Sequence, residues 1–170
     1  MDNKPLENKV AKKNILAFDP EKYMPKQNDI ASLDLKQFLF KELLLKEKDF
    51  RESLKNFDFT TFKNKFVYVF CSSEAIIPMW AYMLVASYLE PFSEKTIFSN
   101  DAKEAKEQFL IYNLQKLDNS QFIDQRIVIK GCGKEQVSPQ LYMALMEKLL
   151  PLAKAINFGE ACSMVPISKK

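Results

Sequence analysis

Phe66-Val-Tyr-Val-Phe-Cys-Ser-Ser-Glu-Ala-Ile-Ile-Pro78 is one of two similar stretches in this chain, and Ile127-Val-Ile-Lys-Gly-Cys-Gly-Lys-Glu-Gln-Val-Ser-Pro139 is the other. In both, a β-branched or aromatic run precedes the pattern Cys-x-x-Glu-x-x-x-Pro. Short continuous apolar runs are typical of strands buried on both faces of a sheet. Proline suits the first position of a helix, where its missing N–H costs nothing. The two stretches therefore predict the same passage from strand through loop to helix, twice.

The similarity continues on both sides of the cysteines. Asp58 matches Asp118 with a one-residue offset, and residues 78–98 match residues 139–158. Each copy is expected to form a helix, a turn, a strand, a cysteine loop, a helix and a strand. We therefore predict an α/β fold with a mostly parallel sheet from a duplicated α-β-α-β unit, both copies lying in one sheet with right-handed crossovers.

The chain of 170 residues suits a single domain with a proper core. The expected parts are an N-terminal arm and helices at 1–53, copy one at 54–101 and copy two at 114–162. Ile15–Asp19 is expected to be a short strand or an extended arm. A helical segment over Asp34–Asn56, with a break near residues 46–48, should cover one face of the sheet. We predict a solvated helix over residues 101–116. We also predict a solvated tail at Lys169-Lys170.

Composition narrows the classes of function. The net charge is +3 and 47% of the residues are hydrophobic, so a folded chain is expected. No basic stripe is interleaved with aromatic residues, which argues against a nucleic-acid partner. No segment is long and apolar enough to predict a membrane span or a signal peptide. The sequence predicts a cytoplasmic protein, and in that reducing compartment its three cysteines are not expected to form structural disulfides.

Missing residue types restrict the chemistry further. The chain has no histidine, which excludes Ser-His-Asp and Cys-His catalysis and histidine-containing zinc sites. Only three glycines are present, so neither a complete G-x-G-x-x-G loop nor a Walker loop can form. Gly131-Cys-Gly133 is only a fragment of such a loop. Catalysis is therefore uncertain, and the balance favours a protein that is not an enzyme.

All three cysteines, Cys71, Cys132 and Cys162, follow predicted strands. Parallel strands end at one edge of a sheet, where ligands bind, and neighbouring strands lie roughly 4.8 Å apart. A tetrahedral metal with metal–sulfur bonds of about 2.3 Å needs thiolates nearly that close. The three thiols therefore predict a site for zinc, iron or an iron–sulfur cluster. One position would remain for a carboxylate, with the following candidates: Glu74, Glu135 and Glu160.

Several other interpretations stay open. One alternative is that the cysteines are ordinary buried residues, since cysteine is among the most buried types. The alternative for Glu74 and Glu135 is that they only complement a helix dipole. A thiol enzyme is a second hypothesis, with Cys71 or Cys132 as nucleophile and the amides of Gly131–Gly133 holding an anion. A third is an interaction module in which the apolar helix that begins at Pro78 forms a homodimer interface.

Four segments carry a resemblance to a known family. They are Leu45–Arg51, Ala75–Leu84, Val128–Cys132 and the ending Phe158–Lys170. Together they resemble the bacterial proteins called domain of unknown function 2480, over nearly the whole chain. The resemblance implies that the cysteines at 71, 132 and 162 belong to the family pattern. It also implies a link to iron–sulfur cluster assembly, with assembly proteins as partners. We expect an accessory protein that binds a metal ion or an iron–sulfur cluster.

Overall fold

The computed structural model describes residues 15–131, 137–160 and 163–170. The expected strands at residues 66–70 and 127–129 form, as β3 (Phe66–Phe70) and β5 (Arg126–Ile129). They lie in different sheets, however, so the prediction of one shared sheet is wrong. The fold is α/β, and its strands are mostly parallel. The chain forms two compact units, residues 25–109 (unit 2) and residues 1–24 with 110–170 (unit 1).

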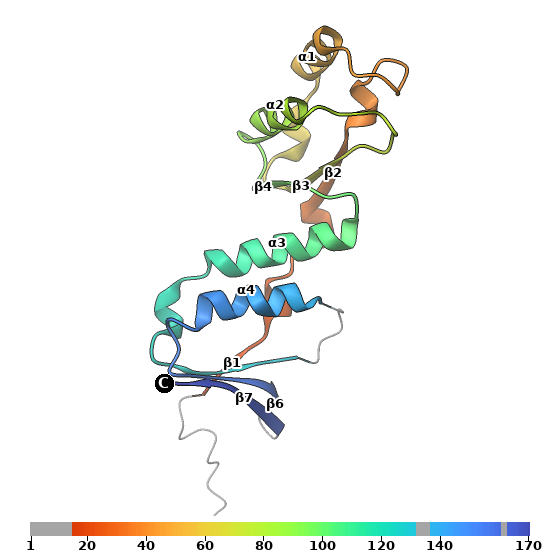
Figure 1. Cartoon of the computed structure of the whole chain (residues 1–170). Coiled ribbons are helices and arrows are strands. Elements are labelled where there is room, and N and C mark those ends of the chain that lie inside the picture. The colour runs from red at the N-terminus through yellow and green to blue at the C-terminus, as the bar shows by residue number, and fades with distance from the viewer. Residues whose placement is uncertain (1–14, 132–136, 161–162) are drawn as a thin grey trace, which may run out of the picture. The chain divides into compact units, whose positions relative to one another are not determined.

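Unit 2 contains the three-stranded sheet, in the order β2-β3-β4, with all strands parallel. Its elements are β2 (Ile30–Asp34), α1 (Glu47–Asn56), β3, α2 (Met79–Leu89), β4 (Lys95–Phe98) and the first half of α3 (Ala102–Lys116). Alternate residues of a strand point to opposite faces. In unit 2, α1 and α2 lie on one side of this sheet and α3 lies on the other (Figure 1). Val67 and Val69 accordingly join the core with α1 and α2, while Phe66 contacts Phe109 of α3 on the other face, with ring centroids 5.1 Å apart.

Unit 1 contains the four-stranded sheet, in the order β1-β5-β6-β7. Its elements are β1 (Ile15–Phe18), the second half of α3, β5, α4 (Pro139–Leu149), β6 (Ala155–Glu160) and β7 (Ser163–Lys169). β1, β5 and β6 are parallel, and β7 pairs antiparallel with β6. Lys169 and Lys170 are exposed as expected, but they do not form a tail, because β7 includes Lys169 and the Lys170 amide donates to the Lys154 carbonyl at 3.0 Å.

The N-terminal half differs from the expectation in two places. Residues 30–34 form β2, which was not predicted, and α1 begins only at Glu47. Lys41 and Glu42 have φ values of 51° and 62°, and a right-handed helix excludes such positive values. The two residues instead form a turn that the Phe40–Leu44 bridge closes. The expected helix over Asp34–Asn56 is thus limited to its last part, which contributes Phe50 and Leu54 to the core of unit 2.

α3 is not the solvated helix that was expected. Ala105 and Phe109 are buried in unit 2, and Leu110 and Leu114 are buried in unit 1. Its side chains therefore contribute to the packing of both units. Whether the two units unfold together as the single domain expected from the sequence stays a prediction.

The two units have the same internal order at a sequence offset of 60, from Asp58 to Asp118. Each aspartate caps a short 3-10 helix, and Asn64 and Asp124 follow with φ of 59° and 56°. The Asn64 amide donates to the Phe92 carbonyl at 2.8 Å, and the Asp124 amide donates to the Leu152 carbonyl at 3.0 Å. The buried positions correspond as well, in the pairs Leu54 and Leu114, Phe62 and Phe122, Val67 and Ile127, Val69 and Ile129, Val85 and Leu145, and Leu89 and Leu149.

This offset changes the alignment of the cysteine loops. α2 begins at Met79 and α4 at Pro139, so the same 60-residue offset holds on both sides of the loops. Cys71 therefore corresponds to Gly131, and the predicted match with Cys132 is wrong by one residue. Pro78 is the residue before its helix rather than the first helical residue. Ser138 caps α4, since its hydroxyl accepts from the Gln140 amide at 3.2 Å.

Candidate functional site

The carboxyl edge of the β2-β3-β4 sheet brings polar side chains from two strands together. β2 ends at Asp34, which is paired with Phe70 at the end of β3, and Cys71 and Ser72 come directly after β3. Parallel strands commonly present ligand-binding residues at this edge. The edge is therefore the candidate site of unit 2, and Cys71 lies at it as the sequence predicted.

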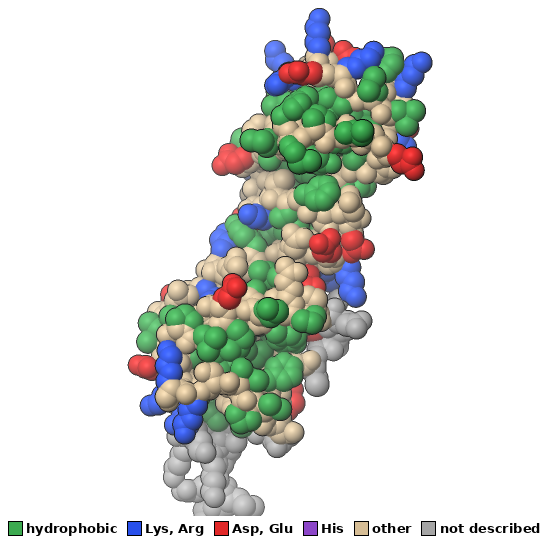
Figure 2. Space-filling view, in the orientation of Figure 1, with side chains coloured by type: hydrophobic (Ala, Val, Ile, Leu, Met, Phe, Trp, Pro, Cys, Tyr) green, Lys and Arg blue, Asp and Glu red, His purple; other side chains and the backbone are tan. Residues whose placement is uncertain are grey.

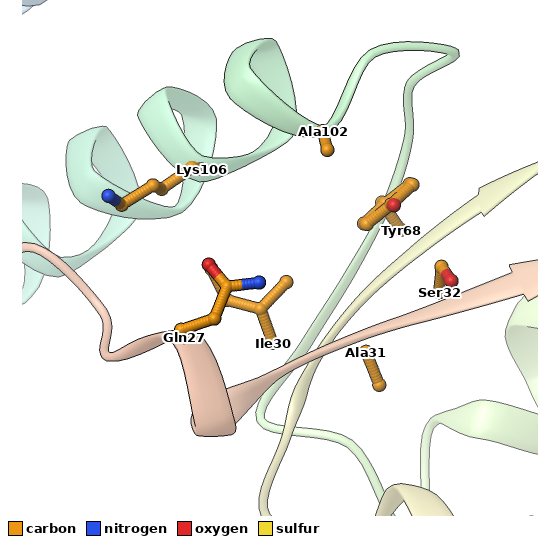
Figure 3. A pocket seen from close by; sticks show the side chains of 7 residues that line it. All are labelled: Gln27, Ile30, Ala31, Ser32, Tyr68, Ala102 and Lys106. Carbon is orange, nitrogen blue, oxygen red and sulfur yellow. The ribbon is translucent and has the colours of Figure 1, made fainter.

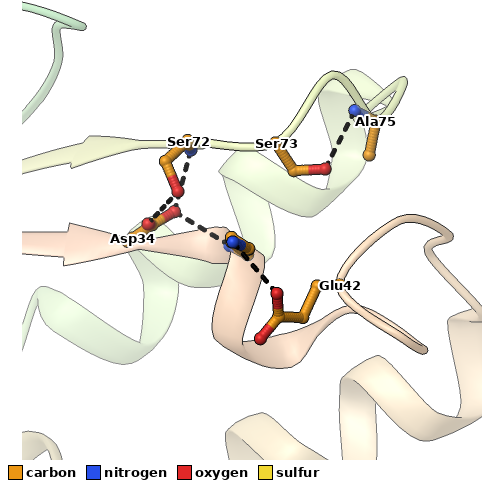
Figure 4. A network of polar contacts seen from close by, with 6 residues as sticks. Asp34, Glu42, Ser72, Ser73 and Ala75 are labelled. Atoms are coloured by element: carbon orange, nitrogen blue, oxygen red, sulfur yellow. Dashed lines mark hydrogen bonds and ion pairs between the residues drawn. The ribbon is translucent and has the colours of Figure 1, made fainter.

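The Asp34 carboxylate joins the ends of the two strands. It accepts hydrogen bonds from the Ser72 amide at 3.0 Å, from the Ser72 hydroxyl at 2.5 Å and from the Lys36 amide at 3.0 Å (Figure 4). Partial burial works against ionisation, but the Ser72 and Lys36 bonds outweigh it and lower the pKa of Asp34. The Lys36 ammonium lies 3.0 Å from the Glu42 carboxylate, which raises the pKa of Lys36. Asp34 is thus an ionised structural acceptor whose oxygens are already engaged.

We expect Asp34→Asn to lower the free energy of unfolding by about 1 kcal/mol at neutral pH, because charge-assisted hydrogen bonds are lost at a partly exposed site. The folded pKa of Asp34 is lowered, so its contribution is present above the unfolded carboxyl pKa of about 3.9 and is lost as the pH falls through the folded value. Urea unfolding of both proteins across pH 3–7 checks this, with Asp29→Asn before β2 as the control. A difference from wild type that stays constant down to pH 3 would show that Asp34 is not the group responsible.

Cys71 is half-buried and packs against the core of unit 2. Residues 72–78 separate it from the start of α2 at Met79, so the thiol does not lie directly at the helix N-terminus. Burial, together with the nearby Cys71, raises the pKa of Tyr82. Glu74 is exposed in the loop. These surroundings fit a packing role for Cys71.

The other predicted ligands are on the unit 1 segments. Glu160 is exposed at the end of β6, whereas Cys132, Glu135 and Cys162 lie outside the described residues. Within residues 15–131, 137–160 and 163–170, no three cysteine, aspartate or glutamate side chains are grouped to hold a metal ion. Because β3 and β5 are in different sheets, Cys71 and Cys132 do not follow neighbouring strands. The three-thiol site stays a prediction, but it can no longer rest on Cys71 and Cys132 following neighbouring strands of one sheet.

β5 and β6 are parallel neighbours, with Ile129 opposite Phe158. Gly131 follows β5, and Glu160 ends β6, so the chain continues from these two places to Cys132 and Cys162. A Cβ atom at Gly131 would lie only 2.0 Å from Phe158 Cζ, which shows how closely this ring approaches the backbone. Glycine here leaves room for the Phe158 ring, whereas unit 2 has Cys71 at the corresponding position.

Asp34 and Ser72 were not among the predicted site residues. A local signal identifies Asp34 but not Ser72, since Ile15–Asp19 and Ile30–Asp34 are both short apolar segments that end in aspartate. In both, the aspartate accepts from the amide two residues later, Glu21 at 3.2 Å and Lys36 at 3.0 Å. The second segment can therefore be recognised as a strand by comparison with the first.

A small polar cavity lies on the α3 face of the unit 2 sheet (Figure 3). Its volume is about 190 Å³, and the residues around it are Gln27, Ile30, Ala31, Ser32, Tyr68, Ala102 and Lys106. Pockets for drug-sized ligands usually measure about 300–1,000 Å³. The lining contains neither a thiol nor a carboxylate, so this cavity offers no metal ligands and no nucleophilic cysteine.

Each unit also has an apolar pocket of about 270 Å³ between its second helix and its sheet. In unit 2 the Tyr82 and Phe98 rings meet edge to face, with centroids 5.4 Å apart. In unit 1 Tyr142 and Phe158 make the same contact at 5.4 Å. The offset of 60 relates both residues of each pair. The sequence analysis did not predict these pockets.

A family model described as "Protein of unknown function (DUF2480)" matches residues 4–170. The chain belongs to this family. Its membership confirms the resemblance seen in the sequence and assigns no activity. No curated protein and no solved structure matches the chain. In the described part of the chain, every helix is too short or too polar to cross a membrane.

Proposed function

We propose that this chain is a non-catalytic accessory protein that binds a metal ion or an iron–sulfur cluster through Cys132 and Cys162. The observation that carries the proposal is the parallel pairing of β5 with β6. Strand neighbours lie about 4.8 Å apart, so adjacent strand ends bring following residues near enough to share a metal. Cys71 is in the other unit and packs on its core, so we assign it no essential role in binding.

The donor chemistry supports this assignment. Two thiolates provide half of a tetrahedral site for zinc or iron, at metal–sulfur distances of about 2.3 Å. The carboxylates of Glu135 and Glu160 are the candidates for the remaining positions. Of these, Glu160 is exposed at the end of β6, where its carboxylate is accessible. In this proposal the protein works in the reducing cytoplasm, with iron–sulfur assembly proteins as partners.

Metal and sulfide analysis after anaerobic purification tests the proposal. We expect a near-stoichiometric metal content in the wild-type protein, with a visible absorbance if the occupant is an iron–sulfur cluster. Cys132→Ser and Cys162→Ser should each lose most of it, because one thiolate is too few to retain the ion. Cys71→Ser is the matched control and should keep the wild-type content. A wild-type protein without bound metal, or equal retention in all three variants, would rule out the assignment.

We also propose that the two units are copies of one duplicated β-α-β-α-β unit. The correspondence of core positions, 3-10 helix caps and left-handed residues at a constant offset supports a common origin. In this view the copies diverged at the carboxyl edge, where unit 2 has Cys71 and Ser72 and unit 1 has Gly131 and Cys132. When the two units are aligned, the cysteine of unit 1 thus lies one residue further along the chain than the cysteine of unit 2.

An interaction module is the second candidate function, and the surface of α2 favours it. Met79 and Met83 are 74% and 73% exposed, although α2 is apolar almost throughout. Flexible methionine side chains are frequent at surfaces that bind other proteins. The two functions are compatible, because the methionines are in unit 2 and the proposed thiolate site is in unit 1.

A further inference from the structure

The apolar pocket of unit 1 has a strand beside it. β7 pairs antiparallel with β6, with Phe158 opposite Val165, and the Ile167 side chain of β7 lines the pocket formed by Ile129, Tyr142, Met146 and Phe158. The added strand thus supplies both backbone pairing for β6 and an aliphatic side chain for the pocket. Phe158 is half-buried in this arrangement.

The corresponding pocket of unit 2 has no such strand in the described chain. β4 corresponds to β6, yet its strand neighbour in the described sheet is β3 alone. Phe98, the counterpart of Phe158, is 54% exposed. Hydrophobic side chains gather over the α2 region of unit 2 (Figure 2), and Met83 lines the open pocket together with Phe98. The unit 2 pocket therefore has the same surroundings as the unit 1 pocket, except that no added strand lines one side of it in the described chain.

An open sheet edge of this kind can accept another chain. Edge strands present backbone N–H and C=O groups that pair readily with an extended peptide, and neighbouring pockets for side chains then supply specificity. β4 contains no proline, and its one charged residue is Lys95 at its start, so residues 96–98 leave the edge open to pairing. The position of β7 in unit 1 indicates the direction of the missing strand and the kind of side chain that fits.

We propose that unit 2 binds an extended segment of a partner protein, antiparallel to β4, with a branched aliphatic side chain in the Val69–Tyr82–Phe98 pocket. The template is β7, in which Ile167 lines the equivalent pocket from the added strand. The β7 strand of this chain is already paired with β6, and the same holds in a second copy. The occupant is therefore a segment of another protein with β7-like chemistry, short, extended and aliphatic at one inward position.

A synthetic peptide with the sequence of residues 163–170 is the probe, and the full-length protein labelled with ¹⁵N is the target. We expect saturable shifts of the Thr96, Ile97 and Phe98 amides at up to millimolar peptide. Replacing the peptide isoleucine that corresponds to Ile167 by serine should weaken binding about tenfold or more, because the aliphatic burial is lost. Phe98→Ala in the protein should weaken binding similarly, and Ala86→Arg, at an exposed pocket position on α2, should block it.

The same spectra identify the outcomes that overturn the proposal. The absence of shifts at Thr96–Phe98 would show that this edge does not accept a strand. Shifts confined to Ile156–Phe158 would show that the peptide only replaces β7 on β6. A wild-type dimer that Phe98→Ala dissociates, with no peptide binding at β4, would show that a second copy covers the edge. The proposal is independent of the metal site, since it requires no cysteine.

Discussion

Phe50→Ala is expected to lower the free energy of unfolding of unit 2 by about 3–5 kcal/mol, because it leaves a cavity in a packed core. Phe50 is fully buried. Its ring meets Phe38 and Trp80 edge to face, with centroid distances of 6.0 and 5.9 Å. Replacing the ring removes both aromatic contacts, and the two partner rings are held by separate elements, the short helix Leu35–Phe38 and α2, so the site cannot collapse freely.

Urea unfolding followed by tryptophan fluorescence measures this effect, because Trp80 contacts Phe50 directly. Leu43→Ala is the control, since Leu43 is 69% exposed and its removal should change the free energy by no more than about 0.5 kcal/mol. Equal effects of the two substitutions would contradict the packing of unit 2. A far-UV circular dichroism transition that coincides with the Trp80 fluorescence transition would support one cooperative domain, whereas a second dichroism transition that the fluorescence does not follow would show that the units unfold separately.

Gly159→Ala is expected to destabilise the β6–β7 hairpin, with a cost of about 2–4 kcal/mol from backbone strain and crowding. Gly159 has φ of 117°, a conformation that residues with a side chain rarely adopt. A Cβ atom there would lie 2.6 Å from the Ser163 carbonyl oxygen, which is backbone and cannot rotate away. The substitution should therefore weaken the pairing of β6 with β7 in particular.

Amide hydrogen exchange of Val165 and Ile167 reports on this hairpin, together with global unfolding in urea. Met164→Ala is the matched control, because Met164 is opposite Gly159 and its side chain is 38% exposed. It should leave protection of the strand nearly unchanged. Wild-type protection and stability in Gly159→Ala would contradict the backbone geometry assigned to the hairpin.

Local structure could be predicted where a continuous hydrophobic run marks a strand or where a proline marks the start of a helix. The strands at 66–70 and 126–129 and the helices at 79–89 and 139–149 follow such signals. The assignment of strands to sheets could not be predicted in this way. Val67–Phe70 and Ile127–Ile129 have the same apolar character, so each could pair with any similar strand, and their true neighbours β2 and β1 are distant in sequence.

β2 and the shortened α1 show a second limit. Residues 34–56 are rich in leucine, lysine and glutamate, which are good helix formers, and this composition favoured one helical segment. The left-handed residues Lys41 and Glu42 interrupt it without a glycine or proline that would have predicted the break. Tertiary packing of Leu33, Leu35 and Phe38 into the core outweighs local propensity there.

The candidate site was only partly predictable for a different reason. The shared pattern Cys-x-x-Glu-x-x-x-Pro aligned Cys71 with Cys132, because matching residue types outweighed the offset of the flanking segments. Hydrogen bonds at Asn64 and Asp124 and the helix starts fix the correct offset, and they place Gly131 opposite Cys71 in the alignment. The Asp34–Ser72 contact joins residues far apart in sequence and has no local signal beyond the strand-ending aspartate.

X-ray absorption spectroscopy at the metal edge, on protein purified anaerobically, tests the proposed thiolate site most directly. We predict sulfur neighbours at about 2.3 Å from the metal, in both the wild-type protein and Cys71→Ser. The double variant Cys132→Ser/Cys162→Ser should lack this sulfur shell. A wild-type shell made only of oxygen or nitrogen would contradict the account, as would a sulfur shell that depends on Cys71 and persists in the double variant.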